Sequence, residues 1–169
     1  MADTASAFTP PALLIEAHDF SNFNSGTDIL DEWLKHRAVD NLKSAASRSY
    51  VICPAGTNEV IGFYALSMGQ IFGHAVVGSM RRNMPPQIPS VILGRLAIDK
   101  TWQGRGLGRA LLADAVRRSL RAATEVSARL IIVHAISPAA EAFYLHHGFT
   151  RLPTESPTLA FDLNKAQKF

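Results

Sequence analysis

The stretch VILGRLAIDKTWQGRGLGR, residues 91–109, decides the fold of the chain. An apolar run from Val91 to Ile98 predicts a buried strand, and apolar residues at helical spacing predict a helix over Leu107–Glu125. The segment Gln103–Gly108 between them contains three glycines, which leave the backbone bare of side chains. Several N–H groups at the start of the helix can therefore point at one anion, aided by the positive end of the helix dipole. The stretch predicts a phosphate-binding turn.

The spacing of the glycines restricts which phosphate ligand this turn can hold. A P-loop needs GxxxxGK[ST], and no Lys-Ser or Lys-Thr pair follows the glycines. A dinucleotide fingerprint needs GxGxxG, whereas Gly104, Gly106 and Gly108 are spaced GxGxG. In addition, the next predicted strand, Leu130–Ala135, ends without the acidic residue that would hold a ribose. The remaining pattern, Q-x-x-G-x-G, also fits an ordinary connection between a strand and a helix.

This hexapeptide resembles the pyrophosphate loop of the GNAT acyltransferase superfamily, which has the form [QR]-x-x-G-x-[GA] after the fourth strand of that fold. In that family the loop holds the pyrophosphate of acetyl-CoA. The resemblance therefore implies that acetyl-CoA is the co-substrate. The residues that it assigns to cofactor binding are Leu96, Ala97, Ile98, Gln103, Gly104, Arg105, Gly106, Leu107, Gly108 and Arg109.

A second block of sequence agrees with the first. Ser137 and Pro138 predict the start of a short helix, with Ser as N-cap and Pro at the first helical position, and Gly148 predicts its end. The segment AEAFYLHHGF resembles the next helix and strand of the GNAT family, where a Phe-Tyr pair is followed by Gly-Phe. The resemblance implies that Phe143 faces the core and that Tyr144 is the catalytic acid at the thioester sulfur. A half-buried tyrosine with a hydrated hydroxyl is the structural alternative.

Length and composition are those of one compact domain. With 169 residues, of which 47% are hydrophobic, the chain can bury a full core, so we expect residues 1–169 to form a single domain. No stretch approaches about twenty consecutive apolar residues, and the N-terminal sequence lacks the basic flank of a signal peptide. We therefore expect a soluble, cytoplasmic protein that does not bind membranes. Its single cysteine, Cys53, lies in an apolar run and is expected to be a buried thiol.

Positive charge is concentrated before and within the glycine-rich turn. Residues 81–109 carry six Lys or Arg and one acidic residue, although the whole chain has a net charge of only +3. Arg105 and Arg109 are most simply explained as ligands of the CoA phosphates. Arg81, Arg82 and Arg95 are not explained in this way. They fit either a solvated charged surface or contacts with the phosphate backbone of an RNA substrate.

The remaining periodicity predicts an α/β (α+β) protein. Residues 68–90, with three glycines and three prolines, are expected to form a long mobile connection with a short helix around His74–Arg81. The GNAT resemblance implies a mixed, mostly antiparallel central sheet of about six to seven strands, flanked by helices and splayed between the fourth and fifth strands. The other expected elements are a strand at Leu13–Ile15, a helical region from Thr27 or Asp28 to about Ala46, a hairpin of Ser49–Cys53 with Val60–Leu66, and a C-terminal pair of Phe149–Leu152 with Thr158–Leu163.

The N-terminal half narrows the resemblance to one group of GNAT proteins. The segments SGTDILDEWLKHRAVDN, SRSYVIC, VIGFYALSMG and RRNMP, followed by GRLAID, closely resemble the acetyltransferase toxins of bacterial toxin–antitoxin pairs. Those toxins acetylate the free amino group of an amino acid esterified to tRNA and thereby inhibit translation. The resemblance implies aminoacyl-tRNA as substrate, a ribbon-helix-helix antitoxin as partner, operator DNA bound only through that antitoxin, and a homodimer.

The expected reaction is a direct transfer with no covalent enzyme intermediate. The amino group of an esterified amino acid has a pKa no higher than about 7.7–8.0, so a dedicated base is unnecessary. Backbone N–H groups near Ala97 and Ile98 would polarise the thioester carbonyl. His134 competes with Tyr144 for the proton-transfer role, and no residues have metal-ligand spacing. Two other functions stay open: a GNAT enzyme for a small amine or protein N-terminus, and a non-catalytic regulator that binds CoA or nucleic acid.

Overall fold

The computed structural model describes residues 6–168, which form two compact parts. The first part holds the described residues up to Leu66 together with Arg95–Asp114, and the second holds Ser67–Gly94 together with the residues from Ala115 onward. Three elements contribute residues to both parts: strand β3 (Gly62–Phe72), strand β4 (Gln87–Ile98) and helix α4 (Leu107–Glu125).

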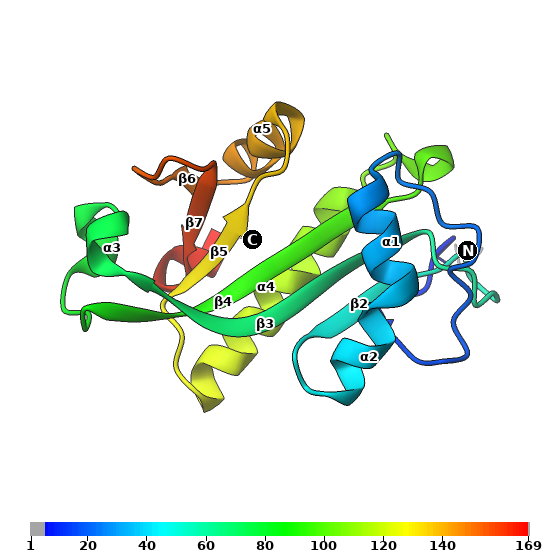
Figure 1. Cartoon of the computed structure of the whole chain (residues 1–169), viewed down its shortest axis with the longest axis horizontal. Helices are drawn as coiled ribbons and strands as arrows, with labels where there is room; N and C mark the ends of the chain where they lie inside the picture. The colour runs from blue at the N-terminus through cyan, green and yellow to red at the C-terminus, as the bar shows by residue number, and fades with distance from the viewer. Residues whose placement is uncertain (1–5, 169) are drawn as a thin grey trace, which may run out of the picture. The chain divides into compact units, whose positions relative to one another are not determined.

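The first part is built on antiparallel strands. Strand β1 (Ala12–Leu13) pairs with β2 (Arg48–Ile52), and β2 pairs with the beginning of β3, where Tyr50 lies opposite Tyr64. Helices α1 (Asp28–His36) and α2 (Ala38–Lys43) connect β1 to β2, as the blue and cyan ribbons of Figure 1 show. Apolar side chains of these elements form one core, which includes Leu14, Phe23, Leu30, Leu34, Ala38, Val51, Phe63 and Ala97.

The second part contains the C-terminal strands. Strand β5 (Leu130–His134) runs parallel to β4, strand β7 (Thr158–Asp162) is antiparallel to β5, and β6 (Thr150–Arg151) pairs with β7. Its remaining elements are the 3-10 turn η1 (Gly73–Ala75), helix α3 (Gly78–Arg81), helix α5 (Pro138–His146) and the 3-10 turn η3 (Leu163–Lys168). A core of its own joins α3 to the strands through Val76, Met80, Ile88, Leu130, Ile132, Leu152 and Ala160.

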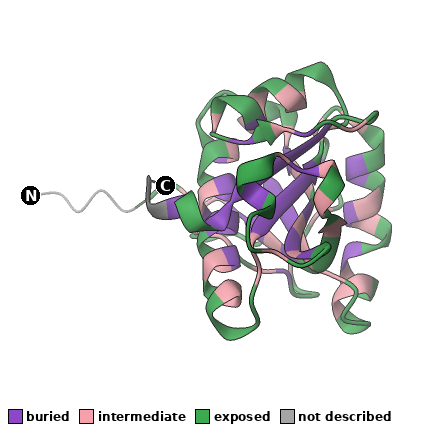
Figure 2. Ribbon diagram, turned by 90° about the vertical axis from the view of Figure 1, so that its left-hand side faces the viewer, coloured by how far each residue is buried: buried purple, intermediate pink, exposed green. Residues whose placement is uncertain are grey.

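The strand order confirms the expected architecture. Hydrogen bonding follows the order β1-β2-β3-β4-β5-β7-β6, so the seven-stranded sheet is mixed and mostly antiparallel. The parallel β4–β5 pairing extends only from Ser90 to Leu93, whereas β4 continues to Ile98, and this fits a splay between these two strands. Figure 2 shows that buried residues follow the strands, while the outer sides of the helices are exposed.

The expectation of a long mobile connection at residues 68–90 was wrong. Strand β3 continues to Phe72 and β4 begins at Gln87, so only the tip of this hairpin leaves the sheet and carries α3. Gly69, which looked like a breaker in the sequence, lies inside β3. A side chain would not fit there, because a Cβ atom would lie 2.7 Å from Cγ1 of Ile92 on β4. The glycine therefore permits two strands to approach closely and does not mark a loop.

The other expected elements are present with small shifts at their ends. Helix α4 has the predicted bounds, Leu107–Glu125, and the predicted helical region appears as α1 and α2. The C-terminal antiparallel pair is present as β6 and β7. Cys53 is buried, with 3% of its surface exposed, as expected for a structural thiol. Within residues 6–168, no helix is both long and apolar enough to cross a bilayer.

Candidate active site

The loop between β4 and α4 is held in shape by Gln103. The Nε2 atom of Gln103 donates to the carbonyl oxygens of Ile98, at 2.9 Å, and Ser25, at 3.0 Å. Asp99 Oδ1 accepts from the backbone N–H of Thr101 at 3.0 Å and so caps the 3-10 turn η2 (Lys100–Trp102). Both side-chain amide hydrogens of Gln103 therefore bond to backbone carbonyls of the protein, and the role of this residue is to fix the shape of the loop.

Two glycines of this loop adopt a backbone conformation that favours glycine. Gly104 has φ of +77° and Gly106 has φ of +79°, and a Cβ atom added to either would meet no atom within 4 Å. Packing inside the protein therefore does not explain these glycines. The left-handed backbone and the open space in front of it together form a cradle of the kind that accepts a phosphate group.

Helix α4 begins directly after this cradle. The N–H of Ala110 donates to the carbonyl of Gly106 at 3.1 Å, so the N–H groups of Leu107, Gly108 and Arg109 precede the first hydrogen bond of the helical ladder. Arg105 is exposed, and its guanidinium carbon lies 4.6 Å from the centre of the Trp102 ring. The expected cofactor residues 103–109 are thus contiguous around one helix start, where several backbone N–H groups precede the helical hydrogen bonds.

The end of β4 supplies the three other expected cofactor residues. Ala97 and Ile98 are buried, with 6% and 9% exposure, and Leu96 is half-buried. Gly62 of β3 packs tightly against Ile98, since a Cβ atom at Gly62 would lie 2.7 Å from Cδ1 of Ile98. Ile98 therefore packs closely against the neighbouring strand, next to the backbone N–H groups that are expected to polarise a carbonyl.

Tyr144 is buried on α5, whose start has the predicted caps. The hydroxyl of Ser137 accepts from the N–H of Ala140 at 3.1 Å, and Pro138 is the first helical residue. The Tyr144 side chain is 7% exposed, and its ring lies 5.3 Å from that of Phe149. Its hydroxyl makes no hydrogen bond to any residue that the structure describes.

Burial raises the pKa of Tyr144 well above its ordinary value, because the phenolate would lose its hydration. The hydroxyl therefore stays protonated through the physiological range. A protonated group without a protein partner can donate to a developing anion, which suits the role of general acid.

The neighbours of Tyr144 differ in part from expectation. Phe143 was expected to face the core, but it is half-buried and makes edge contacts with Tyr144 and His147 at 5.2 and 4.7 Å between ring centres. The expectation was wrong because the helix turns its buried face toward Phe149, which places Tyr144 inside. His134 is exposed at the end of β5, where its Nδ1 shares a hydrogen bond of 3.0 Å with Thr158 Oγ1. A His134 held in this way stays a candidate for proton transfer.

The arginines expected to contact RNA lie in different parts of the molecule and have different surroundings. Arg81 and Arg82 are exposed at the end of α3, in the second part of the molecule. Arg95 belongs to the first part, where its guanidinium carbon lies 4.6 Å from the centre of the Trp33 ring. Trp33 in turn stacks in parallel on Phe63 at 6.1 Å. The aromatic support of Arg95 could not be inferred from sequence spacing, because Trp33 lies on α1 and Arg95 on β4.

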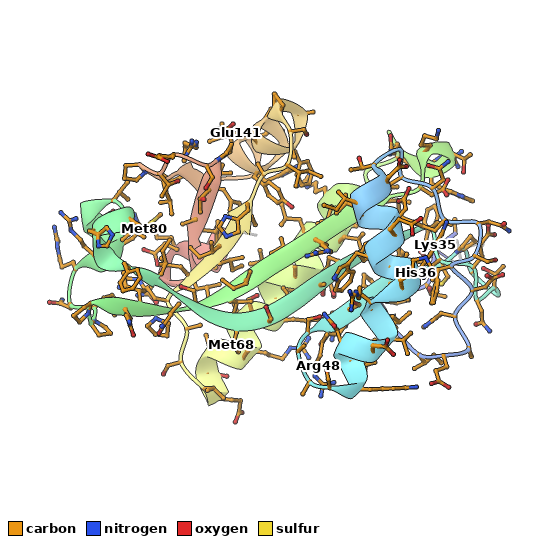
Figure 3. All side chains as sticks on the ribbon, in the orientation of Figure 1. Lys35, His36, Arg48, Met68, Met80 and Glu141 are labelled. Atoms are coloured by element: carbon orange, nitrogen blue, oxygen red, sulfur yellow. The ribbon has the colours of Figure 1, made fainter. Side chains whose placement is uncertain are left out.

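The second part also contains an ion pair that could not be predicted from the sequence. Arg129 Nε lies 2.9 Å from Asp162 Oδ1, and both side chains are largely buried, with 14% and 3% exposure. A second pair, between Arg151 Nε and Glu141 Oε1 at 3.1 Å, joins α5 to β6; Figure 3 labels Glu141 on this helix. The only sequence signal for Arg129 was its place directly before an apolar strand.

The whole arrangement has counterparts among known proteins. A family model described as an acetyltransferase (GNAT) domain matches residues 45–151. A tRNA-acetylating toxin of Mycobacterium tuberculosis (strain ATCC 25618 / H37Rv) is 42% identical over 150 residues, which cover 89% of each protein.

Solved structures of two complexes agree with this match. The toxin AtaT complexed with acetyl-methionyl-tRNAfMet has a TM-score of 0.86 at 29% identity, covering 93% of this chain and 95% of that one. A tyrosine-to-phenylalanine mutant of AtaT, bound to the C-terminus of the antitoxin AtaR and acetyl-CoA, has a TM-score of 0.80 at 29% identity and covers 94% of both chains. With a matching family model over most of its length and a relative at this level of identity, the chain belongs to the GNAT acetyltransferase family.

Proposed function

We propose that this protein is a toxin that transfers the acetyl group of acetyl-CoA to the free amino group of an aminoacyl-tRNA and thereby inhibits translation. The observation that carries the proposal is the 42% identity to a tRNA-acetylating toxin, which extends over 89% of both chains. The loop after β4 and the buried Tyr144 support the chemistry, since each is suited to one task of an acetyl transfer.

The residues at the start of α4 fit the pyrophosphate of acetyl-CoA. In this proposal the N–H groups of Gly106, Leu107 and Gly108 bind the phosphate oxygens, and Arg105 and Arg109 offset their charge. The open space in front of Gly104 and Gly106 supports this assignment, because a phosphate must approach the backbone more closely than a side chain would permit. Leu96, Ala97 and Ile98 supply the backbone that binds the acetyl-bearing end.

The transfer is a single displacement at the acetyl carbonyl. The neutral amine of the substrate attacks the carbonyl carbon, so a C–N bond forms, the C–S bond breaks and the amine loses one proton to solvent. Backbone N–H groups of Ala97 and Ile98 stabilise the developing oxyanion, and Tyr144 donates its hydroxyl proton to the departing thiolate. Tyr144 then regains a proton from solvent, which has received the proton of the amine. The substrate amine has a pKa of about 7.7–8.0, so a sizeable neutral fraction exists without a protein base.

We also propose the partners that such a toxin requires. They are an antitoxin of the ribbon-helix-helix class, a second copy of this chain in a homodimer, and operator DNA that the toxin reaches only through its antitoxin. The proposed location is the cytoplasm, where charged tRNA is available. The basic residues Arg81, Arg82 and Arg95 are proposed to contact the tRNA.

Acetylation with labelled acetyl-CoA tests this function directly. The protein is incubated with labelled acetyl-CoA and a mixture of charged tRNAs, and the labelled product is identified by mass spectrometry after mild hydrolysis of the ester. We expect an N-acetyl amino acid released from tRNA, with no label on uncharged tRNA.

The alternatives predict different results in the same experiment. Label on a small amine or on a protein N-terminus, with none on tRNA, would identify another acceptor class and contradict the proposal. Binding of acetyl-CoA with no transfer to any acceptor would point to a non-catalytic regulator. The Tyr144→Phe variant serves as the control for enzyme-dependent transfer.

A further inference from the structure

A pocket of about 680 Å³ opens in the second part of the molecule, where α3 meets the beginning of β5 and the end of β7. Its polar lining comes from three segments that are far apart in the sequence: Arg82 and Asn83 follow α3, Arg129 precedes β5, and Asp162, Asn164 and Lys165 belong to β7 and the turn after it. Figure 3 labels Met80 on α3. This side chain packs into the hydrophobic core of the strands and holds the helix in place.

Arg129 fixes the wall of this pocket. Its Nε and Nη2 atoms donate to the two carboxylate oxygens of Asp162 at 2.9 and 3.2 Å, and Nη2 also donates to the carbonyl of Ser79 on α3 at 3.2 Å. Asp162 Oδ1 further accepts from the N–H of Asn164 at 3.0 Å. Asp162 is the only carboxylate among the described residues of the lining, and the bidentate contact with Arg129 offsets its negative charge.

Each of the remaining polar side chains of the lining carries at least one donor, and none of them is a carboxylate. Arg82 and Lys165 are exposed, and neither side chain forms an ion pair or a hydrogen bond within the described residues. The Nη1 group of Arg129 likewise has no partner in that part of the chain, and the amides of Asn83 and Asn164 add neutral donors. Several donors, two uncompensated cations and no free carboxylate form a site for an anion with several acceptor oxygens, which is the chemistry of a phosphate group.

The strand register gives the distance from this pocket to the catalytic end of β5. Asp162 pairs with Leu130 at one end of the β5–β7 ladder, and Thr158 pairs with His134 at the other, where the chain leads into the helix of Tyr144. Four residues at roughly 3.3 Å each separate the two ends by about 13 Å. Alternation along the strands places Asp162, Thr158 and His134 on the same face of the sheet. One strand of double-stranded DNA advances about 3.4 Å per nucleotide, so a distance of about 13 Å is of the order of a few nucleotides.

We propose that this pocket, around Arg82, Arg129 and Lys165, binds a backbone phosphate of the tRNA substrate a few nucleotides away from its aminoacylated end. The inference rests on the proposed function and deepens it, since it adds Arg129 and Lys165 to the RNA surface and gives Arg82 a structured site. Arg129 orders the pocket, and the exposed side chains of Arg82 and Lys165 supply the positive charges that meet the phosphate.

Charge reversal at Arg82 and Lys165 tests the proposal. The double variant Arg82→Glu, Lys165→Glu is compared with wild type and with Arg121→Glu, which reverses an exposed cation of α4 outside the pocket. We expect the double variant to lose about tenfold or more in kcat/KM with charged tRNA, and its logarithmic salt slope to fall by about one unit, because one phosphate contact is lost. Arg121→Glu is expected to keep the wild-type rate and slope.

A minimal acceptor separates RNA binding from damage to the active site. The 3′-aminoacyl ester of adenosine carries the reacting amine but no phosphodiester, so the double variant is expected to acetylate it at the wild-type rate. An equal loss with this acceptor and with charged tRNA would show that the substitutions disturb the enzyme itself, and would overturn the proposal.

A direct measurement of tRNA binding makes the test independent of the proposed function. The affinity for uncharged tRNA, measured by fluorescence anisotropy, needs no turnover, so it tests the pocket even if the acceptor proves to be another molecule. Equal tRNA affinity of wild type and double variant overturns the proposal, as does a loss that affects only antitoxin binding. Adenosine monophosphate is expected to compete only at millimolar concentration, and tight binding of this mononucleotide would assign the pocket to a free nucleotide instead.

Discussion

Two helices of this chain follow apolar strands, and their first turns differ in what satisfies the backbone N–H groups. Helix α4 follows Gly106, which has no side chain to cap it, and the space in front of that glycine is open. Helix α5 follows Ser137, whose hydroxyl accepts from the N–H of Ala140. The first helix therefore keeps donors for an external anion, whereas the second satisfies its own donors and serves as a support for Tyr144.

The largest effect is expected from closing the open end of α4. Gly106→Glu places a side chain and a negative charge where the pyrophosphate is proposed to bind, so acetyl-CoA binding should fall below detection by calorimetry. Gly56→Glu is a matched control, because Gly56 also has a positive φ, of +76°, and open space around it, but lies in a turn outside the site. Unchanged affinity in a folded Gly106→Glu protein would show that the loop is an ordinary turn.

The second largest effect is expected at Tyr144, the side chain that helix α5 supports. Tyr144→Phe removes only the hydroxyl and should lower kcat by about 10²-fold, while the affinity for acetyl-CoA and the melting temperature stay near those of wild type. Tyr50→Phe, at a half-buried tyrosine of β2, provides the control and should retain full activity. Wild-type turnover in Tyr144→Phe would remove this residue from the chemistry and direct attention to His134.

The pH dependence follows from the same burial. Because the pKa of Tyr144 is raised, the residue keeps its proton to higher pH than an exposed tyrosine and stays able to donate it. The substrate amine has a pKa no higher than about 7.7–8.0, so kcat/KM should rise about tenfold per pH unit below that pKa and level off above it. Initial rates corrected for ester hydrolysis, measured up to about pH 9.5, check this expectation. A decline in that upper range would indicate an acid with an ordinary or lowered pKa.

The smallest effect is expected at the cap of α5. Ser137→Ala leaves the N–H of Ala140 without its side-chain partner and should lower the free energy of unfolding by about 1 kcal/mol. Chemical denaturation measures this loss, and Ser137→Asp, which retains a capping oxygen, should recover most of it. Acetyl-CoA affinity should not change in either variant. If Ser137→Ala instead weakened cofactor binding, the contrast between the two helix starts would be lost.

Local signals explain which parts of the fold and the site could be predicted. The bounds of α4 and the caps of α5 follow from apolar spacing and from residues that satisfy backbone groups within a few positions, so they are visible in the sequence. Gly104 and Gly106 in the loop before α4 are predictable in the same way, because a positive φ favours glycine wherever it occurs.

Features that depend on contacts between different elements of the fold could not be predicted. Gly69 resembled a breaker, yet it lies within β3 because Ile92 of β4 approaches it closely. Phe143 and Tyr144 are adjacent, and only the packing of α5 against Phe149 decides that the tyrosine is the buried one. The first contact joins residues of two strands, and the second joins a helix to a residue beyond its end, so neither follows from the spacing within one element.

The sequence by itself determined the order of the strands and helices along the chain, the glycine-rich turn before α4 and the place of Tyr144 on α5, because these depend on spacing within short segments. Only the tertiary structure decided that Arg82, Arg129 and Lys165 line one pocket, and that Arg129 is locked onto Asp162. The physical reason is that charge acts through space. Three cations become one anion site only after the chain has brought their segments together and has neutralised the single carboxylate among them.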